Sequence, residues 1–197
     1  MESNQTRSDP RTNSGQWQLR DLKGPVLAAI QVGAVLVFGI TFAAGGVLRG
    51  LLRGTSELSV SVDSFTPVLI FVVAIPLVLV LHEAIHALLF RLYGGTTRFG
   101  VKLIGRVLPV AYATSTVQMP RNRYLVVCLG PFVLLTAVLL PIAVLAYSDN
   151  AAILALLLVA LNAGGSVGDF VQARQLLRYE RGVLFQDTED GFIWRRQ

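Results

Sequence analysis

Four runs of apolar residues, each long enough to cross a bilayer, limit what this chain can fold into more than any other feature. They cover residues 25–48, 65–90, 124–148 and 151–173. A helix of about 20 residues, rising 1.5 Å per residue, spans the roughly 30 Å hydrocarbon layer of a membrane. Because 53% of the 197 residues are hydrophobic and only 15% are charged, a soluble domain of this size is excluded. The predicted fold class is an all-α integral membrane protein with about four transmembrane helices.

Polar segments separate and flank these runs. Residues 1–24 mix charges with Ser, Thr, Asn and Gln, which predicts a mobile tail. In the middle loop, residues 98–104 and 107–115 alternate as short strands do, so we expect a small membrane-apposed β-hairpin, with a plain connecting loop as the alternative. A second small hairpin is expected within residues 183–194. The predicted organisation is a tail, a four-helix membrane domain and a second tail, at residues 1–24, 25–175 and 176–197.

The basic residues indicate how the chain is oriented. They gather in the N-terminal tail, the middle loop and the C-terminal tail, whereas only Arg49 and Arg53 fall on the other side. The positive-inside rule therefore predicts a multi-pass protein of the cell membrane with both termini in the cytoplasm. The net charge of +5 does not indicate nucleic-acid binding, because the basic residues are scattered at the ends of apolar runs.

The second apolar run holds both histidines of the chain, in the pattern His82-Glu83-Ala84-Ile85-His86. Residues four apart lie on one face of a helix, so His82 and His86 can offer ring nitrogens to one metal ion, with Glu83 beside it. Imidazole suits zinc, and a carboxylate next to a zinc-bound water can act as a general base. Ionisable groups at membrane depth are costly, so three together indicate function rather than a chance pattern.

The fourth apolar run carries a polar stripe. Asn162, Ser166 and Asp169 are spaced i, i+4 and i+7 and must face a partner within the bundle. Asp169 is the only acid besides Glu83 well inside an apolar run, and it lies at a depth similar to that of the histidines, so it is the candidate third zinc ligand. An interfacial carboxylate paired with Arg174 or solvent is the alternative. Asn162 and Ser166 are candidates to hydrogen-bond a zinc ligand or to bind substrate, and the neighbouring glycines would let the second run approach closely.

These residues predict a zinc-dependent peptidase embedded in the membrane, acting on membrane-associated or transmembrane peptides. A substrate in extended form could pair with an edge of the middle hairpin, because a helical backbone hides its carbonyl groups. Two other classes use the same residues: a metal-binding or metal-transporting membrane protein, and a non-catalytic membrane scaffold. The sequence does not define an oligomeric state.

A His-Glu-x-x-His in one membrane helix, Gly130-Pro131 opening the next, and an Asp after an Asn- and Gly-rich stretch resemble the intramembrane site-2 proteases. From about residue 25 onward, the chain more closely resembles the putative zincin peptidase family of small membrane proteins, whose late-helix motif has the form Ser166-Val167-Gly168-Asp169. The resemblance implies that His82, His86 and Asp169 are zinc ligands and that Glu83 is the catalytic acid and base. The chain departs from site-2 proteases because it lacks their Asn-Pro and Leu-Asp-Gly motifs near Asp169.

Overall fold

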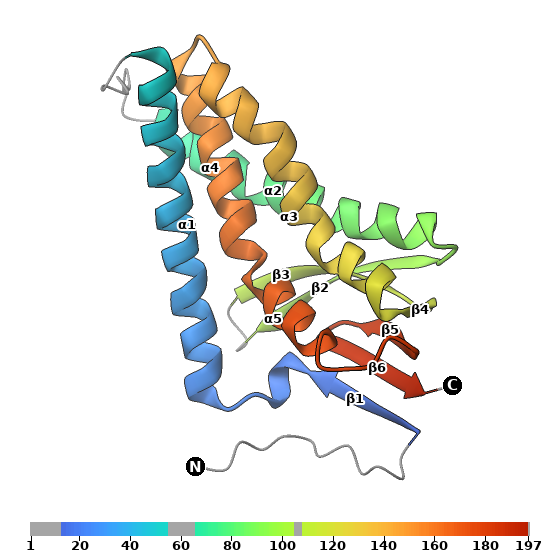
Figure 1. Cartoon of the computed structure of the whole chain (residues 1–197). Helices are drawn as coiled ribbons and strands as arrows, with labels where there is room; N and C mark the ends of the chain where they lie inside the picture. Colours follow the sequence, from blue (N-terminus) through green and yellow to red (C-terminus); the bar gives the residue numbers. More distant parts are fainter. Residues whose placement is uncertain (1–12, 55–65, 105–107, 197) are drawn as a thin grey trace.

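The computed structural model describes residues 13–54, 66–104 and 108–196, and shows a helical bundle joined to two small antiparallel sheets (Figure 1). The helices are α1 Gly24–Arg53, α2 Thr66–Leu92, α3 Arg121–Leu145, α4 Asp149–Gly165 and α5 Val167–Leu176. Four helical stretches, Gly24–Arg53, Leu69–Leu92, Arg121–Leu145 and Asp149–Leu176, are long and apolar enough to cross a membrane. The four apolar runs of the sequence are thus confirmed as helices.

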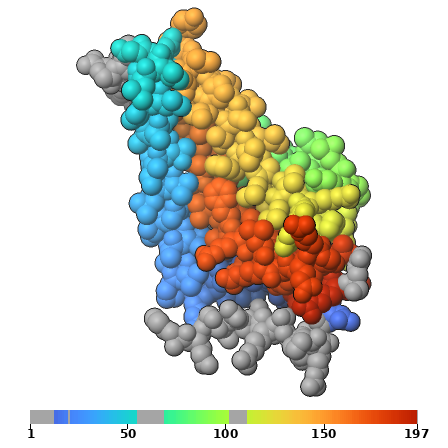
Figure 2. Space-filling model, in the orientation of Figure 1, coloured from blue at the N-terminus to red at the C-terminus, as the bar shows by residue number. Residues whose placement is uncertain are grey.

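Helix α4 forms the centre of the bundle. It packs against α1, α2 and α3, and most of its residues are buried, whereas α1 buries only Gly45 and Arg49. Figure 2 shows α1 lying along one side of the molecule as an outer helix. Gly164 permits part of this packing, because a side-chain carbon there would lie 2.9 Å from the carbonyl oxygen of Ala34 on α1. The helix that approaches this glycine is therefore α1, and the expectation that it would be the second apolar run is wrong.

The fourth predicted span is divided into two segments at Ser166. The hydroxyl of Ser166 donates to the backbone carbonyl of Asn162 at 2.8 Å, and the backbone N–H of Ser166 contacts the same oxygen at 2.9 Å. A side chain that bonds back to the preceding turn disturbs regular helix geometry. The polar stripe therefore continues from α4 onto α5, with Asp169 in the first turn of α5.

The middle loop forms the expected hairpin. Its strands are β2 Thr97–Ile104 and β3 Leu108–Ser115, which pair antiparallel from Thr97↔Ser115 to Ile104↔Leu108. Both strands contact α2, and β3 does so more extensively. The hairpin thus lies against the helix that carries the two histidines.

A four-stranded sheet corrects the all-α prediction. Its strands are β1 Ser14–Gln18, β4 Gln118–Pro120, β5 Val183–Thr188 and β6 Gly191–Arg196, in the order β1-β6-β5-β4. The hairpin expected near the C-terminus is confirmed as β5 and β6, but it belongs to this larger sheet. Residues 13–24 are not a mobile tail, because they form β1, a 3-10 turn at Leu19–Asp21 and the start of α1. The rest of the predicted N-terminal tail lies outside the described residues.

Aromatic residues explain why the two ends of the chain fold together. Trp17 of β1 stacks on Phe192 of β6 with ring centroids 5.5 Å apart, and Phe185 and Trp194 are buried in the same cluster. The cluster also includes Tyr124 of α3 and the single cysteine, Cys128, as a packing residue. Burial of aromatic surface is a large source of folding free energy, so the sheet is held by the same core as the helices.

Candidate metal centre

The site begins with the two histidines on α2. His82 and His86 are one turn apart, and their rings meet edge to face with centroids 4.9 Å apart. Each side chain is largely buried, at 11% and 12% exposed. Two imidazoles on one helix face are thereby presented to the same space, as their four-residue spacing predicts.

Asp169 of α5 faces both histidines. Its Oδ2 lies 3.1 Å from Nε2 of His82, and its Oδ1 lies 3.6 Å from Nε2 of His86. One potential ligand atom from each of the three residues lies within 4.8 Å of the others. The structure thus brings Asp169 to His82, 87 positions away in sequence, and to His86, and it directs the carboxylate to the histidines rather than to the alternative partner, Arg174.

Asn162 of α4 determines which nitrogen of His82 faces this space. The amide nitrogen of Asn162 donates to the backbone carbonyls of Pro131 and Phe132, at 3.3 and 3.4 Å. Its amide oxygen is therefore free to accept, and it lies 3.0 Å from Nδ1 of His82. With the proton on Nδ1, the lone pair of Nε2 points towards Asp169, which is the tautomer a metal ligand needs.

The donor set fits zinc. Two histidine nitrogens and a carboxylate oxygen are ligands of catalytic zinc, which keeps a further position open for water. Atoms bound at about 2.1 Å to a tetrahedral ion lie about 3.4 Å apart, and the two nitrogen–oxygen distances of 3.1 and 3.6 Å lie on either side of that value. A hydrogen bond that holds the other ring nitrogen of a ligand histidine, as Asn162 provides for His82, is also typical of zinc sites.

The comparison with known proteins agrees with this donor set. A family model described as "Putative zincin peptidase" matches residues 65–184, which include all three residues and Glu83. The chain belongs to this family. Searches of curated proteins and of solved structures found no match. Membership of the family indicates a zinc metallopeptidase.

Glu83, the remaining residue of the zincin motif, lies outside the cluster of three ligand atoms but lines the same cavity. The backbone of Ala113 on β3 is within hydrogen-bonding range of its carboxylate. The cavity has a volume of about 350 Å³ and is bordered by α2, β3, α3, α4, α5 and the β5–β6 turn. The motif carboxylate therefore faces a space large enough for several water molecules or for a short length of peptide.

Three residues of the zincin cavity were not identified from the sequence. The hydroxyl of Tyr124 donates to a carboxyl oxygen of Asp187 and also lies 3.2 Å from the carbonyl oxygen of Gly191, and it accepts a hydrogen bond from Gln172 at 2.6 Å. Burial raises the pKa of the Asp187 carboxyl well above its ordinary value, by more than the hydrogen bonds from Tyr124 and Gln172 lower it. These residues lie on three different elements, and no short motif connects them, so a single sequence does not reveal the group.

Gly130 of α3 also contributes to the zincin site, by letting α3 approach α2. A side-chain carbon at Gly130 would lie 2.2 Å from Leu89 and 3.9 Å from Ile85, both on α2. Pro131, which follows it, provides one of the two carbonyls that orient Asn162. The Gly-Pro pair of the sequence therefore acts through packing and through a backbone carbonyl. The hydroxyl of Ser166, the other candidate of the polar stripe, donates to the backbone carbonyl of Asn162.

Proposed function

We propose that this protein is a zinc-dependent peptidase, embedded in the membrane, that hydrolyses peptide bonds of membrane-associated substrates. The observation that carries the proposal is the meeting of Asp169 with both motif histidines in a cavity that Glu83 also lines. The likeness to site-2 proteases rests on the residues alone and stays a prediction.

The chemistry follows from the roles these residues can take. A zinc ion held by His82, His86 and Asp169 would acidify a water molecule and polarise a peptide carbonyl. The Glu83 carboxylate would accept the proton of that water and then deliver it to the nitrogen of the departing amine. Asn162 would keep His82 in the tautomer that leaves Nε2 unprotonated. The cavity walls would exclude bulk water, which strengthens each electrostatic interaction inside.

Strand β3 would hold the substrate. One of its edges pairs with β2, and Ala111, Tyr112 and Ala113 line the cavity beside Glu83. An extended peptide that added to β3 would place its backbone carbonyls next to the catalytic carboxylate. A transmembrane substrate would have to unwind locally, because its helical carbonyls are engaged in internal hydrogen bonds.

The membrane setting is supported by the outer surfaces of the helices. Large apolar side chains on α1, α2 and α3 point outward and are exposed, among them Val35, Ile40, Val72, Val80 and Val138. Lipid contact would cover this apolar surface, which is larger than soluble proteins normally expose. Figure 1 shows the α3–α4 turn and the end of α1 at one end of the molecule and the four-stranded sheet at the other. The excess of basic residues at the sheet end favours a cytoplasmic sheet and cytoplasmic termini.

The decisive experiment compares zinc content and proteolysis in the full-length protein reconstituted in liposomes. Glu83→Gln should keep about one zinc per chain and lose cleavage of membrane peptides, because an amide cannot accept the water proton. The double variant His82→Ala with His86→Ala should lose the zinc, and Asp169→Ala should weaken zinc binding at least tenfold. Glu180→Gln, an exposed surface change of the same chemistry, is the matched control.

The outcomes separate the three function classes. Zinc binding with cleavage that depends on Glu83 supports a peptidase. Metal transport that survives Glu83→Gln, without any cleavage by the wild type, would replace the proposal with a transporter. Unchanged zinc content in the double histidine variant, measured by elemental analysis, would favour a scaffold in which these residues hold no metal.

A further inference from the structure

Asp169 lies on a helix that is separated from the central helix of the bundle. Helix α5 begins at Val167, after the break at Ser166, and it packs more extensively against α3 and α1 than against α4. Regular continuation of α4 therefore does not set the rotation of α5 about its own axis. The direction of the Asp169 carboxylate, in the first turn of α5, depends on the contacts that hold the sides of this short helix.

Gln172 holds the face of α5 that carries Asp169. It follows Asp169 by three residues, so the two side chains leave neighbouring turns on the same face. The amide nitrogen of Gln172 donates to the hydroxyl of Tyr124 on α3 at 2.6 Å, and both residues line the cavity of the metal centre. A rotation of α5 that turned Asp169 away from the histidines would also draw Gln172 away from Tyr124, because both side chains move with one backbone.

Tyr124 is a fixed partner for this hydrogen bond. Its side chain is 1% exposed, and its ring packs against Phe185 of β5 and Phe192 of β6, with centroids 6.1 and 6.2 Å apart. Its hydroxyl also donates to a carboxyl oxygen of Asp187 on β5. A close-packed ring whose hydroxyl is bonded in this way has little freedom to move. The contact therefore fixes Gln172 to Tyr124 rather than the reverse.

Apolar packing places α5 against α3 with less directional control. Phe170 meets Phe132 of α3 edge to face, with ring centroids 5.0 Å apart, and Ala173 is buried in the aromatic core. Apolar burial is non-directional, whereas a hydrogen bond weakens steeply as its angle departs from linearity. The hydrogen bond from Gln172 therefore restricts the rotation of α5 more closely than this packing does.

We propose that Gln172 is a positioning residue for the zinc ligand Asp169, and that it acts by bonding α5 to the hydroxyl of Tyr124. The proposal rests on the proposed function, since it takes Asp169 as a zinc ligand. Gln172 acts through the backbone of α5, and this role requires contact with neither the metal nor the substrate.

The test measures the zinc affinity of the full-length protein in detergent by competition with a chromogenic chelator. Gln172→Met keeps a side chain of similar length but removes the amide donor, and Tyr124→Phe removes the hydroxyl. Each change should weaken zinc binding about tenfold, because the carboxylate of Asp169 would no longer be held towards the histidines. Gln175→Met, the same change about one turn farther along α5 at a residue that does not line the cavity, should keep the wild-type affinity.

Double variants show whether Gln172 acts through Asp169. In the Asp169→Ala background the ligand is gone, so Gln172→Met should weaken zinc binding by no more than about twofold further. A purely structural role would instead lower the affinity by the same factor in both backgrounds. Gln172→Met combined with Tyr124→Phe should cost little more than the larger single change, because both remove the same hydrogen bond.

The cobalt-substituted protein gives a second measurement. The visible absorption of Co²⁺ depends on its ligands and their geometry, so Gln172→Met should change the bands and Gln175→Met should leave them as in the wild type. Thermal midpoints of the metal-free variants show whether they fold. A changed spectrum with an unchanged midpoint supports the positioning role, because a general loss of structure would lower the midpoint.

The results distinguish this proposal from the proposed function. Wild-type affinity in Gln172→Met and Tyr124→Phe, or an equal loss from Gln172→Met with and without Asp169, overturns the positioning role and leaves the peptidase intact. Zinc affinity that depends on Gln172 only when Asp169 is present, in a protein that cleaves no peptide, supports the positioning role and overturns the peptidase. Wild-type affinity in Asp169→Ala overturns both this role and the ligand set of the proposed function.

Discussion

Asn162 connects the fold to the chemistry of the site through a single side chain. Its amide nitrogen bonds to two carbonyls of α3, and its oxygen contacts Nδ1 of His82. We expect Asn162→Ala to weaken zinc binding between about 10- and 100-fold, because the tautomer and ring orientation of His82 would no longer be fixed. Competition with a chromogenic zinc chelator measures this change.

Ser166→Ala provides the comparison for that prediction. Ser166 is as deeply buried as Asn162, but its hydroxyl bonds to a carbonyl of its own helix. Its zinc affinity should stay within about twofold of the wild type. An equal loss in both variants would mean that helix packing, rather than the contact with His82, determines the affinity.

Asp187 makes the stability of the protein depend on pH. Its pKa is raised in the folded state by burial, so the folded protein keeps a proton that the unfolded chain releases above about pH 3.9. The contribution of this proton to the free energy of unfolding is fully present below that pH. It declines as the pH rises towards the raised pKa of the folded state. Asp187→Asn should therefore raise the thermal midpoint in detergent at pH 7 and leave it nearly unchanged at pH 4. A midpoint difference that is the same at both pH values would contradict the protonated state of Asp187.

The residues of the site differ in how far sequence could reveal them. His82, Glu83 and His86 follow from a five-residue pattern, because helix geometry alone places them together. Asp169 required an argument from depth and polarity, and the structure brings its carboxylate to both histidines. Asn162 and Ser166 were equal candidates for a hydrogen bond to a metal ligand. The polar stripe shows which face of the helix points into the bundle, but it does not show which polar side chain reaches a ligand. Asp187 contacts Tyr124 of α3, and Leu19 bonds to Asp190, which is distant in sequence; a local pattern shows neither contact.

The contact of α1 with α4 depends on one glycine. An alanine at Gly164 would place its methyl carbon 2.9 Å from the carbonyl of Ala34 and 3.2 Å from Phe38. We expect Gly164→Ala to cost about 1–3 kcal/mol through overpacking, measured as a lower thermal midpoint in detergent. Gly39→Ala on α1, which meets nothing within 4 Å, should instead be neutral or stabilising by up to about 1 kcal/mol, because alanine favours the helix. Equal effects of the two changes would remove the packing explanation.

The helices were the predictable elements, and the strands only partly so. Long apolar runs define membrane-length helices almost independently of context. Strands β2, β3, β5 and β6 were expected because their residues alternate. Strand β1 has five residues and one large aromatic, and it is stabilised by Phe192 near the other end of the chain. A segment this short has no period of its own, so its polar composition predicted a mobile tail instead.

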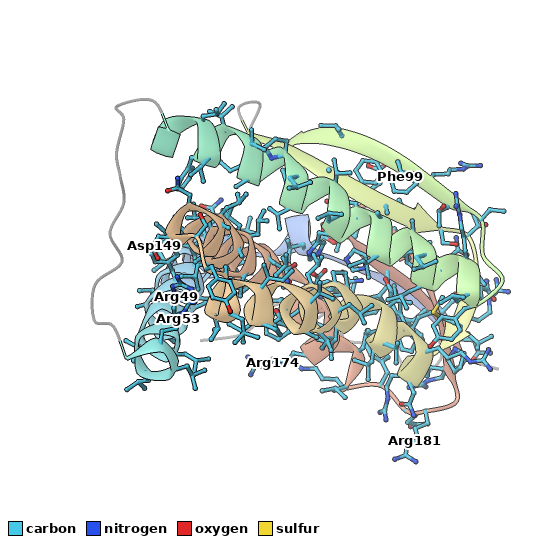
Figure 3. All side chains as sticks on the ribbon, turned by 90° about the horizontal axis from the view of Figure 1, so that it is seen from above. Arg49, Arg53, Phe99, Asp149, Arg174 and Arg181 are labelled. Carbon is cyan, nitrogen blue, oxygen red and sulfur yellow. The ribbon has the colours of Figure 1, made fainter. Side chains whose placement is uncertain are left out.

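At the scale of the whole molecule, a cluster of charges fixes the end of the bundle opposite the four-stranded sheet. Figure 3 shows Arg49, Arg53 and Asp149 grouped together. The guanidinium of Arg49 is buried, and it donates to the carbonyls of Ala143, Val144 and Ala146 and to Asp149 at 2.8 Å. These contacts satisfy carbonyls at the end of α3 while joining α1 to α4.

Arg49→Lys should therefore lower the stability of the protein by roughly 2 kcal/mol, because an ammonium group cannot reproduce the forked donor geometry. Its zinc affinity should not change, since Asn162 lies 13 residues along α4 from Asp149, or about 20 Å at 1.5 Å per residue. Thermal unfolding in detergent and zinc titration measure the two effects separately. Arg181→Lys, which points outward in Figure 3, is the control and should alter neither. Loss of zinc affinity in Arg49→Lys would show that the two ends of the bundle are coupled.

The pairing of β1 with β6 affects the order in which the parts of the fold can form during synthesis. β1 leaves the ribosome long before β6, because the two paired strands lie far apart in the sequence. Until residues 190–196 have been synthesised, β1 has no partner strand and the turn at Leu19 has no Asp190 carbonyl to hold it. The membrane helices can insert, and the histidines and Asp169 can meet, before Leu19 reaches the cavity that it lines in the completed fold. A chain stalled before residue 190 would thus have the metal ligands in place but a cavity that Leu19 does not yet line, so the synthesis of β6 is the step that completes it.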